Sequence, residues 1–304
     1  MKNYFETISI INKELFFIDE QIKRIISYSP NFLFDNLIDF ILAKSKKIRS
    51  VITILVLKSI LGEVSETQLK ICALVELIHN ASLIHDDIID NAEKRRNKPS
   101  FNKLFGEKNA VITGDFLLSL SLKELSNINN SKVTSFFANS LTNICLGELN
   151  QNFERHQILS IEKYIEKSKL KTAELFKLSL NSCLIAENQQ KYLNFAEDFT
   201  NNFGIAFQIR DDINDFSKNL SDKTKNDFQN GIYTAPIIYF KEQYQNKEIS
   251  IENILNSNAI TKSELLCNHY VNNALDLLTD FSDNQYKTIL TNLCKQLKGP
   301  NDEN

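Results

Sequence analysis

Apolar and polar positions alternate with the period of an α-helix along almost the whole chain. Apolar residues recur three and four positions apart, and the 304 residues include only 7 glycines and 4 prolines to interrupt them. Long periodic segments with few breakers predict an all-α protein. The expected helices cover residues 4–28, 31–45, 48–61, 66–91, 108–127, 131–156, 161–185, 190–217, 233–246, 262–280 and 283–297.

The domain organisation follows from length and composition. The hydrophobic content of 42% is enough for a large core, and no Pro/Ser/Gly-rich linker or clear internal repeat divides the chain. We therefore expect a single domain over residues 1–304, with an N-terminal helix within 1–30 and a frayed tail at 299–304.

Charge and cysteine content exclude several classes of protein. The formal net charge is −3 and no arginine-rich arm is present, so nucleic acid is not an expected partner. The 5 cysteines show no C-x-x-C spacing, which indicates reduced thiols instead of a zinc site or a disulfide framework. No apolar run approaches the roughly 18 residues of a membrane span, and no signal peptide is visible. We expect a cytoplasmic protein without a transmembrane segment.

Two acidic motifs carry the chemistry. Both read D-D-x-x-D and both lie at the end of an apolar helical segment; their carboxylates are Asp86, Asp87, Asp90, Asp211, Asp212 and Asp215. On a helix the first and last carboxylates of each motif lie one turn apart on the same face, with the middle one close beside them. Such crowding of negative charge favours a hard divalent cation with oxygen ligands.

A solvated acidic face is the plain alternative for either motif. The residues before each motif are apolar on most faces, for example Leu83 and Ile84 or Phe207 and Ile209, which indicates buried helices. Unpaired buried carboxylates are costly, and a second copy with the same spacing favours function. An EF-hand loop is excluded because neither motif has its alternating ligands and central glycine. Basic residues follow each motif, so metal and phosphate ligands lie together as a diphosphate site requires.

Residues 43–240 resemble the trans-polyprenyl diphosphate synthases, and within them the long-chain, octaprenyl diphosphate synthase-like members. The segment from Glu76 to Asp90 is similar to the first aspartate-rich motif of that family, and the segment from Gly204 to Asp212 is similar to the second. The resemblance implies a single-domain, isoprenoid synthase-type helical bundle around a central cavity, with the two acidic helices facing each other. It also implies a homodimer with an apolar interface built from mid-chain helices.

The resemblance further implies which residues bind metal and substrates. Mg²⁺, with three ions per site when substrate is bound, would be ligated by Asp86, Asp90, Asp211 and Asp215, with Asp87 and Asp212 assisting. The allylic diphosphate would be held by Arg95, Lys171, Thr172, Gln208 and Lys223, of which Lys171 also counts as catalytic. Isopentenyl diphosphate would be held by Lys46, Arg49, His79 and Arg96. Taken singly, His79 would more often be a core histidine and Lys171 ordinary helix surface.

The chain departs from the family pattern in a few places. The usual G-G-K-R-L-R-P is replaced by residues 44–50, K-S-K-K-I-R-S, which keep the cations and lose the glycines and the proline. Asn97 follows the arginine pair where glycine is usual, and Asn214 replaces an apolar residue inside the second motif. Ile232 stands where many members carry a lysine.

The implied reaction is head-to-tail condensation by ionisation, condensation and elimination, with no side-chain nucleophile. Ala81 and Ser82 are small where short-chain members place bulky side chains, which predicts a long-chain product; geranylgeranyl and farnesyl diphosphate are the alternative products. A class I terpene cyclase and a non-catalytic subunit of a heteromeric synthase are more remote alternatives. The second D-D-x-x-D motif argues against a cyclase, and the six retained aspartates argue against an inactive subunit.

Overall fold

The computed structural model describes residues 8–42, 45–96, 98–216 and 231–299, and the predicted all-α class is confirmed. The chain divides into two compact units, Met1–Phe137 with Leu178–Gln190 and Ala138–Lys177 with Lys191–Asn304. The expected single domain and the facing of the two acidic helices across a cavity concern the arrangement of these units, and they stay predictions. Among the described helices, none has both the length and the apolar character needed to cross a membrane.

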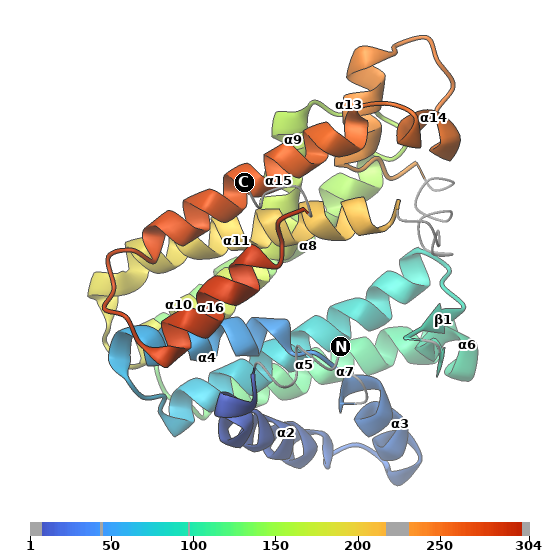
Figure 1. Ribbon diagram of the computed structural model, residues 1–304. Coiled ribbons are helices and arrows are strands. Elements are labelled where there is room, and N and C mark those ends of the chain that lie inside the picture. The colour runs from blue at the N-terminus through green and yellow to red at the C-terminus, as the bar shows by residue number, and fades with distance from the viewer. Residues whose placement is uncertain (1–7, 43–44, 97, 217–230, 300–304) are drawn as a thin grey trace. The chain divides into compact units, whose positions relative to one another are not determined.

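The first unit is built around two long helices that run side by side (Figure 1). Its elements are η1 (Ser9–Ile11), α2 (Asn12–Ile26), α3 (Asn31–Leu42), α4 (Ile48–Leu61), α5 (Glu66–Ile89), β1 (Lys94–Arg95), β2 (Lys98–Pro99), α6 (Phe101–Phe105) and α7 (Glu107–Ser126). It also contains the start of α8 (Ser131–Phe153), the end of α10 (Glu174–Ala186) and the beginning of η3 (Gln190–Tyr192). The long pair is α5 and α7, and α2 packs on both.

Helix α5 is the element that carries the first acidic motif. Its start is fixed by a capping box, in which the Ser65 hydroxyl accepts from the Gln68 backbone N–H at 3.2 Å and the Gln68 side chain accepts from the Ser65 N–H at 2.9 Å. Residues 71–78 are all buried, so the helix passes through the core. Its 24 residues span about 36 Å, which brings the motif from the core to the accessible end of the helix.

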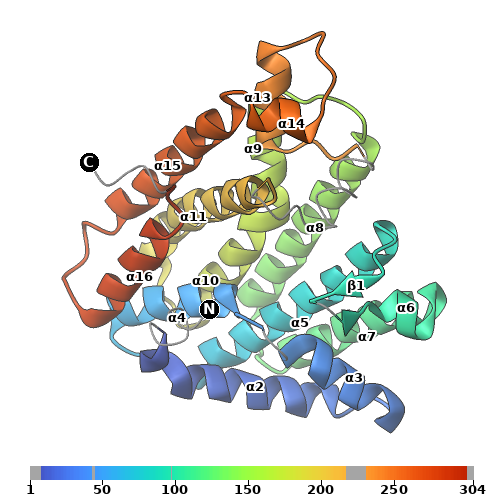
Figure 2. The ribbon, with the colours of Figure 1, turned by 45° about the vertical axis from the view of Figure 1, so that its right-hand side comes forward.

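The second unit pairs the helix of the second acidic motif with a helix of small buried side chains. Its remaining elements are α9 (Ile161–Ser168), the π-helical turn η2 (Lys169–Ala173), α11 (Leu193–Asn214), α13 (Ala235–Gln243), α14 (Ile251–Leu255), α15 (Ala259–Leu277) and α16 (Gln285–Lys295). Helix α15 buries Ala259, Ser263, Cys267, Val271 and Ala274, which are three or four positions apart. Such small side chains let α15 and α11 pack closely along their length (Figure 2).

Most predicted helices are confirmed, and three local features differ. The segment predicted as one helix over 161–185 is interrupted by the π-helical turn Lys169–Ala173. The loop predicted for 91–100 contains the antiparallel pair β1–β2. The short helices α6 and α14 had too few residues to show a helical period.

Candidate active site

Each acidic motif lies at the C-terminal end of its helix, and its last aspartate is the C-cap residue. Asp90 is the C-cap of α5 and donates its backbone N–H to the carbonyl of Asp86 at 2.9 Å. Asp215 is the C-cap of α11 and donates to the carbonyl of Asp211 at 3.1 Å. A helix C-terminus carries a partial negative charge, so three carboxylates there repel both one another and the helix dipole. Cations bound at these ends would relieve that repulsion.

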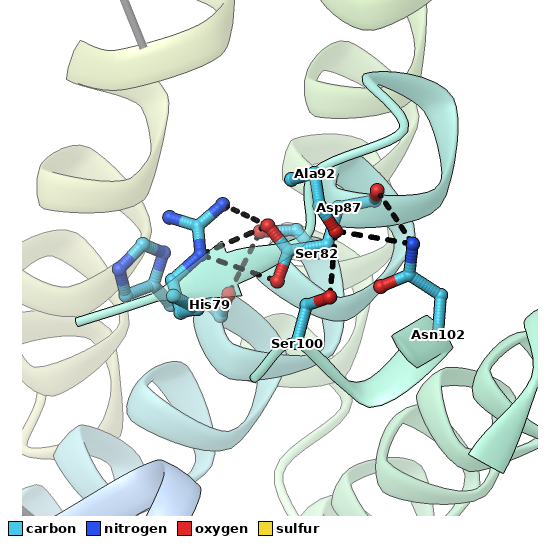
Figure 3. A network of polar contacts seen from close by, with 7 residues as sticks. His79, Ser82, Asp87, Ala92, Ser100 and Asn102 are labelled. Carbon is cyan, nitrogen blue, oxygen red and sulfur yellow. Dashed lines mark hydrogen bonds and ion pairs between the residues drawn. The ribbon is translucent and has the colours of Figure 1, made fainter. Parts of the chain in front are cut away.

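In the first motif the middle carboxylate is turned into the protein. Asp87 is completely buried and binds the guanidinium of Arg95, whose Nε donates to Oδ1 at 3.0 Å and whose Nη2 donates to the same oxygen (Figure 3). The Asp87 backbone carbonyl accepts from Asn102 Nδ2 at 3.2 Å, and that amide also donates to the carbonyl of Ala92 at 3.2 Å. Burial raises the pKa of Asp87, and the hydrogen bond from Arg95 opposes that shift. Asp87 thus ties the loop after α5 to the helix.

The middle carboxylate of the second motif has the same position but different partners. Asp212 is 4% exposed, and its Oδ2 accepts from the Tyr164 hydroxyl at 2.6 Å. Its Oδ1 accepts from Gln208 Nε2 at 2.8 Å, and Gln208 Oε1 accepts from the Thr172 hydroxyl at 2.6 Å. Burial, and then the charge of Asp212, raise the pKa of Tyr164 well above its usual value. Tyr164 therefore stays a donor, and the chain of hydrogen bonds joins α9, the π-turn and α11.

The outer carboxylates remain accessible in both motifs. Asp211 is exposed, and Asp86, Asp90 and Asp215 are partly exposed. Within the described residues, no three acidic, histidine or cysteine side chains converge closely enough to hold a metal ion by themselves. A pair of outer carboxylates from one motif still fits Mg²⁺, because this ion keeps several waters and shares its ligands with substrate phosphates.

Of the residues assigned to isopentenyl diphosphate, Arg49 and Arg96 lie near Glu76, and the charges of both act on His79. Glu76 is 3% exposed, and its charge acts on both Arg49 and Arg96. Burial lowers the pKa of Arg49 to about 10, and Glu76 opposes this shift. Burial also lowers the pKa of His79 well below its usual value, and the arginine charges act in the same direction. His79 is therefore neutral, and its buried Nδ1 has no hydrogen-bond partner among the described residues.

Ser50 gives a physical account of one departure from the family pattern. It stands where the family's proline is usual, and its hydroxyl donates to Glu76 Oε1 at 2.7 Å. Its backbone N–H, which proline lacks, points to the same oxygen at 3.4 Å. The residue before it, Arg49, therefore lies beside a carboxylate held by its own helix. Lys47, which precedes that helix, adopts a left-handed conformation with φ 44°.

Two glycines set the shape of the π-turn that carries Lys171 and Thr172. A Cβ atom on Gly204 of α11 would lie 2.5 Å from the Cα of Ala173, closer than non-bonded carbon atoms come. A Cβ atom on Gly147 of α8 would lie 3.0 Å from Leu170 Cβ. The turn is thus held between two helix backbones. Lys171, at its centre, binds Glu148 of α8 with an Nζ–Oε2 distance of 2.7 Å.

We expect Gly204→Ala to displace the π-turn. Overpacking of this kind costs about 1–3 kcal/mol of unfolding free energy, and the shifted Lys171 should also weaken allylic diphosphate binding. Thermal melting together with the Michaelis constant for that substrate measures both effects. Gly147→Ala serves as the comparison, with a smaller effect expected because its nearest contact is looser. A Gly204→Ala protein that melts like the wild type would contradict the close approach.

The other residues assigned from the sequence are Lys223, Lys46, Ala81 and Ser82. Lys223 falls within residues 217–230, outside the described part of the chain. Lys46 is exposed, Ala81 is fully buried, and Ser82 is partly buried with its hydroxyl donating to the carbonyl of His79 at 2.8 Å. The residues that sequence reasoning missed are Ser50, Glu76, Glu148 and Tyr164. They escaped notice because their roles depend on partners distant in sequence.

Comparison with known proteins decides the family. The family model described as polyprenyl synthetase matches residues 31–271, which is most of the chain. The chain belongs to the polyprenyl synthetase family. The predictions of family membership, of an isoprenoid synthase-type helical fold and of a prenyltransferase are therefore confirmed.

Relatives and solved structures of the polyprenyl synthetase family agree with this assignment. A prenyl transferase of Cyanidium caldarium is 33% identical over 98% of both chains, and a decaprenyl-diphosphate synthase of Dictyostelium discoideum is 31% identical over 82% of this chain and 59% of its own length. Among solved structures, the heptaprenyl diphosphate synthase of Staphylococcus aureus has a TM-score of 0.86 at 25% identity and covers 94% of this chain and 97% of its own. The octaprenyl pyrophosphate synthase of Helicobacter pylori has a TM-score of 0.75 at 28% identity and covers 98% and 99%.

Proposed function

We propose that this member of the family condenses isopentenyl diphosphate head-to-tail onto an allylic prenyl diphosphate and gives a long-chain, all-trans polyprenyl diphosphate. The observation that carries the proposal is the pair of D-D-x-x-D motifs, each with its outer carboxylates accessible and its middle carboxylate bonded inside. Relatives named as decaprenyl, solanesyl and hexaprenyl synthases support the long-chain product over geranylgeranyl or farnesyl diphosphate.

Mg²⁺ is the proposed cofactor, and the outer aspartates are its proposed ligands. When bound, it would neutralise the diphosphate charge that grows as the allylic carbon–oxygen bond breaks. A solved member from Caulobacter crescentus, whose TM-score to this chain is 0.85, is described as complexed with calcium and isoprenyl diphosphate. Because calcium and magnesium both prefer oxygen ligands, that complex supports a divalent cation at the aspartates. The number of ions, three, follows only from the family resemblance.

The cationic and amide side chains have separate proposed tasks. Lys171 and Thr172, on the π-turn, and Gln208, bonded to Thr172, would orient the allylic diphosphate. Arg95 is assigned to the same substrate by the resemblance, as is Lys223. A side chain that donates a hydrogen bond to departing diphosphate oxygens stabilises the charge that develops there.

Isopentenyl diphosphate would bind at the arginine cluster around Glu76. Arg49 and Arg96 supply positive charge, and the neutral His79 can donate a hydrogen bond without adding to the repulsion between them. Lys46 is the remaining cation assigned here by the resemblance. A cyclase, which uses one diphosphate, has no need of this second cationic set.

Product length provides a direct prediction. Ser82 lies one turn before Asp86 on the same face of α5, so we place it at the wall of the hydrocarbon tunnel, below the metal ligands. Ser82→Phe should therefore shorten the product without changing the magnesium dependence, because the ring fills volume and touches no ligand. Mass analysis of the products measures the effect. Ser82→Ala keeps the small size and should leave the product length unchanged; an unaltered product from Ser82→Phe would show that another residue sets the length.

A homodimer is the proposed assembly. Apolar side chains on two mid-chain helices are 42–77% exposed, namely Val111, Ile112 and Leu122 on α7 and Leu146, Leu149 and Phe153 on α8. On each helix by itself, exposed apolar side chains of this kind support contact with a partner chain.

A cytoplasmic location also stays a proposal, and relatives from rice and Neurospora crassa are named as mitochondrial.

The function is tested by incubating the purified protein with Mg²⁺, isopentenyl diphosphate and allylic primers of increasing length. Linear prenyl diphosphates of long chain length are expected. Cyclic hydrocarbons would instead identify a cyclase, and absence of any product would favour a subunit that needs a partner chain.

A further inference from the structure

Lys167 of α9 lies beside the second acidic motif although the sequence pattern did not single it out. It is one helical turn before Lys171 and three residues after Tyr164, so the three side chains share one side of α9 and the π-turn. The ammonium group of Lys167 lies 5.9 Å from the centre of the Tyr164 ring, and the hydroxyl of that ring is bonded to Asp212.

The charges around Lys167 come from several elements of the second unit. Its positive charge is attracted by Asp212 of α11, by Glu148 of α8 and by Glu154 in the turn after α8, and it is repelled by Lys171 of the π-turn. The side chain is partly buried, and burial lowers the pKa of Lys167. A lysine in such a position loses part of its hydration, and nearby anions must compensate for that loss.

The protein's own carboxylates are already shared between the two lysines. Glu148 pairs directly with Lys171 at 2.7 Å, and Asp212 already accepts hydrogen bonds from Tyr164 and Gln208. An anion with several charged oxygens would pair with both ammonium groups at once and remove their mutual repulsion. The exposed Asp211, next to Asp212, is the proposed metal ligand nearest to this pair in sequence.

We propose that Lys167 is a further substrate-binding cation of the second acidic motif, and that its ammonium binds diphosphate oxygens of the allylic substrate together with Lys171. This assignment rests on the proposed function and deepens it. With this assignment, the positive charge of the allylic diphosphate site comes from α9 as well as from the π-turn.

The decisive variant is Lys167→Met, which keeps most of the length of the side chain and removes its charge. Loss of one charge-assisted hydrogen bond should raise the Michaelis constant for the allylic diphosphate about tenfold or more, while the constant for isopentenyl diphosphate stays the same. Lys163→Met, one turn earlier and exposed on the same helix, is the matched control and should change neither constant. The melting temperature of Lys167→Met should not fall.

A second measurement does not depend on turnover. Calorimetric binding of inorganic pyrophosphate in magnesium buffer should weaken in Lys167→Met by a similar factor and stay unchanged in Lys163→Met. The assignment would be overturned if wild type and Lys167→Met had equal pyrophosphate affinity and equal Michaelis constants for the allylic substrate. It would also be overturned if Lys167→Met raised the Michaelis constants of both substrates similarly and lowered the melting temperature. That result would indicate a structural ion pair. If the wild type makes no prenyl product but binds pyrophosphate through Lys167, the proposed function fails, and Lys167 is still identified as a cation that binds diphosphate.

Discussion

Asp211→Ala should lower turnover by about 100-fold or more and leave the melting temperature nearly unchanged. The side chain is exposed at the end of α11, so its removal opens no cavity in the core. What is lost is an oxygen ligand for the cation that stabilises the departing diphosphate. Steady-state rates at saturating magnesium, together with thermal melting, give both quantities.

Asn214→Ala is the matched control for that experiment. Asn214 is exposed, lies three residues further along the same helix, and has no role in the proposed site. Its replacement should leave the rate within about twofold of wild type, as is usual for surface substitutions. An Asp211→Ala protein that keeps most of its activity would remove the second motif from the mechanism.

Asp87→Ala should mainly lower the stability of the protein, because Asp87 binds Arg95 inside the protein while the neighbouring Asp86 is a proposed metal ligand. Asp87 is fully buried, and its removal leaves Arg95, whose side chain is 30% exposed, without its carboxylate partner. Breaking a buried pair costs about 3–5 kcal/mol, and the partial exposure of Arg95 places the expected loss near 3 kcal/mol. We expect the melting temperature to fall by about 5–10 °C.

Asp86→Ala provides the comparison for Asp87→Ala. Its partly exposed side chain should be removable with little change in melting, yet turnover should drop as strongly as for Asp211→Ala. If Asp87→Ala melts like wild type, the bond between Asp87 and Arg95 does not stabilise the loop after α5.

The contrast between outer and middle aspartates shows how far the sequence can lead. The spacing of the motifs places the first and last carboxylates on one face of a helix, and the structure agrees for both motifs. The sequence leaves the middle carboxylate beside them as an assisting group. Its burial became evident only with its partners, since Arg95 follows Asp87 across a loop and Tyr164 precedes Asp212 by 48 residues.

The helix boundaries also differ in whether neighbouring residues or residues distant in sequence determine them. Helix α4 was predicted over 48–61 and is found over Ile48–Leu61, because Gly62, with φ 83°, ends it locally. The π-turn at Lys169–Ala173 has no such marker, since no glycine or proline occurs within it. It depends on the backbones at Gly147 and Gly204, which only the folded structure brings against it.

The π-turn also fixes the rotation of α9 about its own axis. A π-helical turn holds one more residue than the corresponding stretch of α-helix, so loss of a single residue there would yield a continuous helix. Each residue of an α-helix advances the side-chain direction by about 100°. The shorter chain would therefore rotate α9 about its axis relative to α10 and carry the Tyr164 hydroxyl away from Asp212. The one additional residue in the π-turn thus lets α9 and α10 turn different faces toward their neighbouring helices, although the two are continuous.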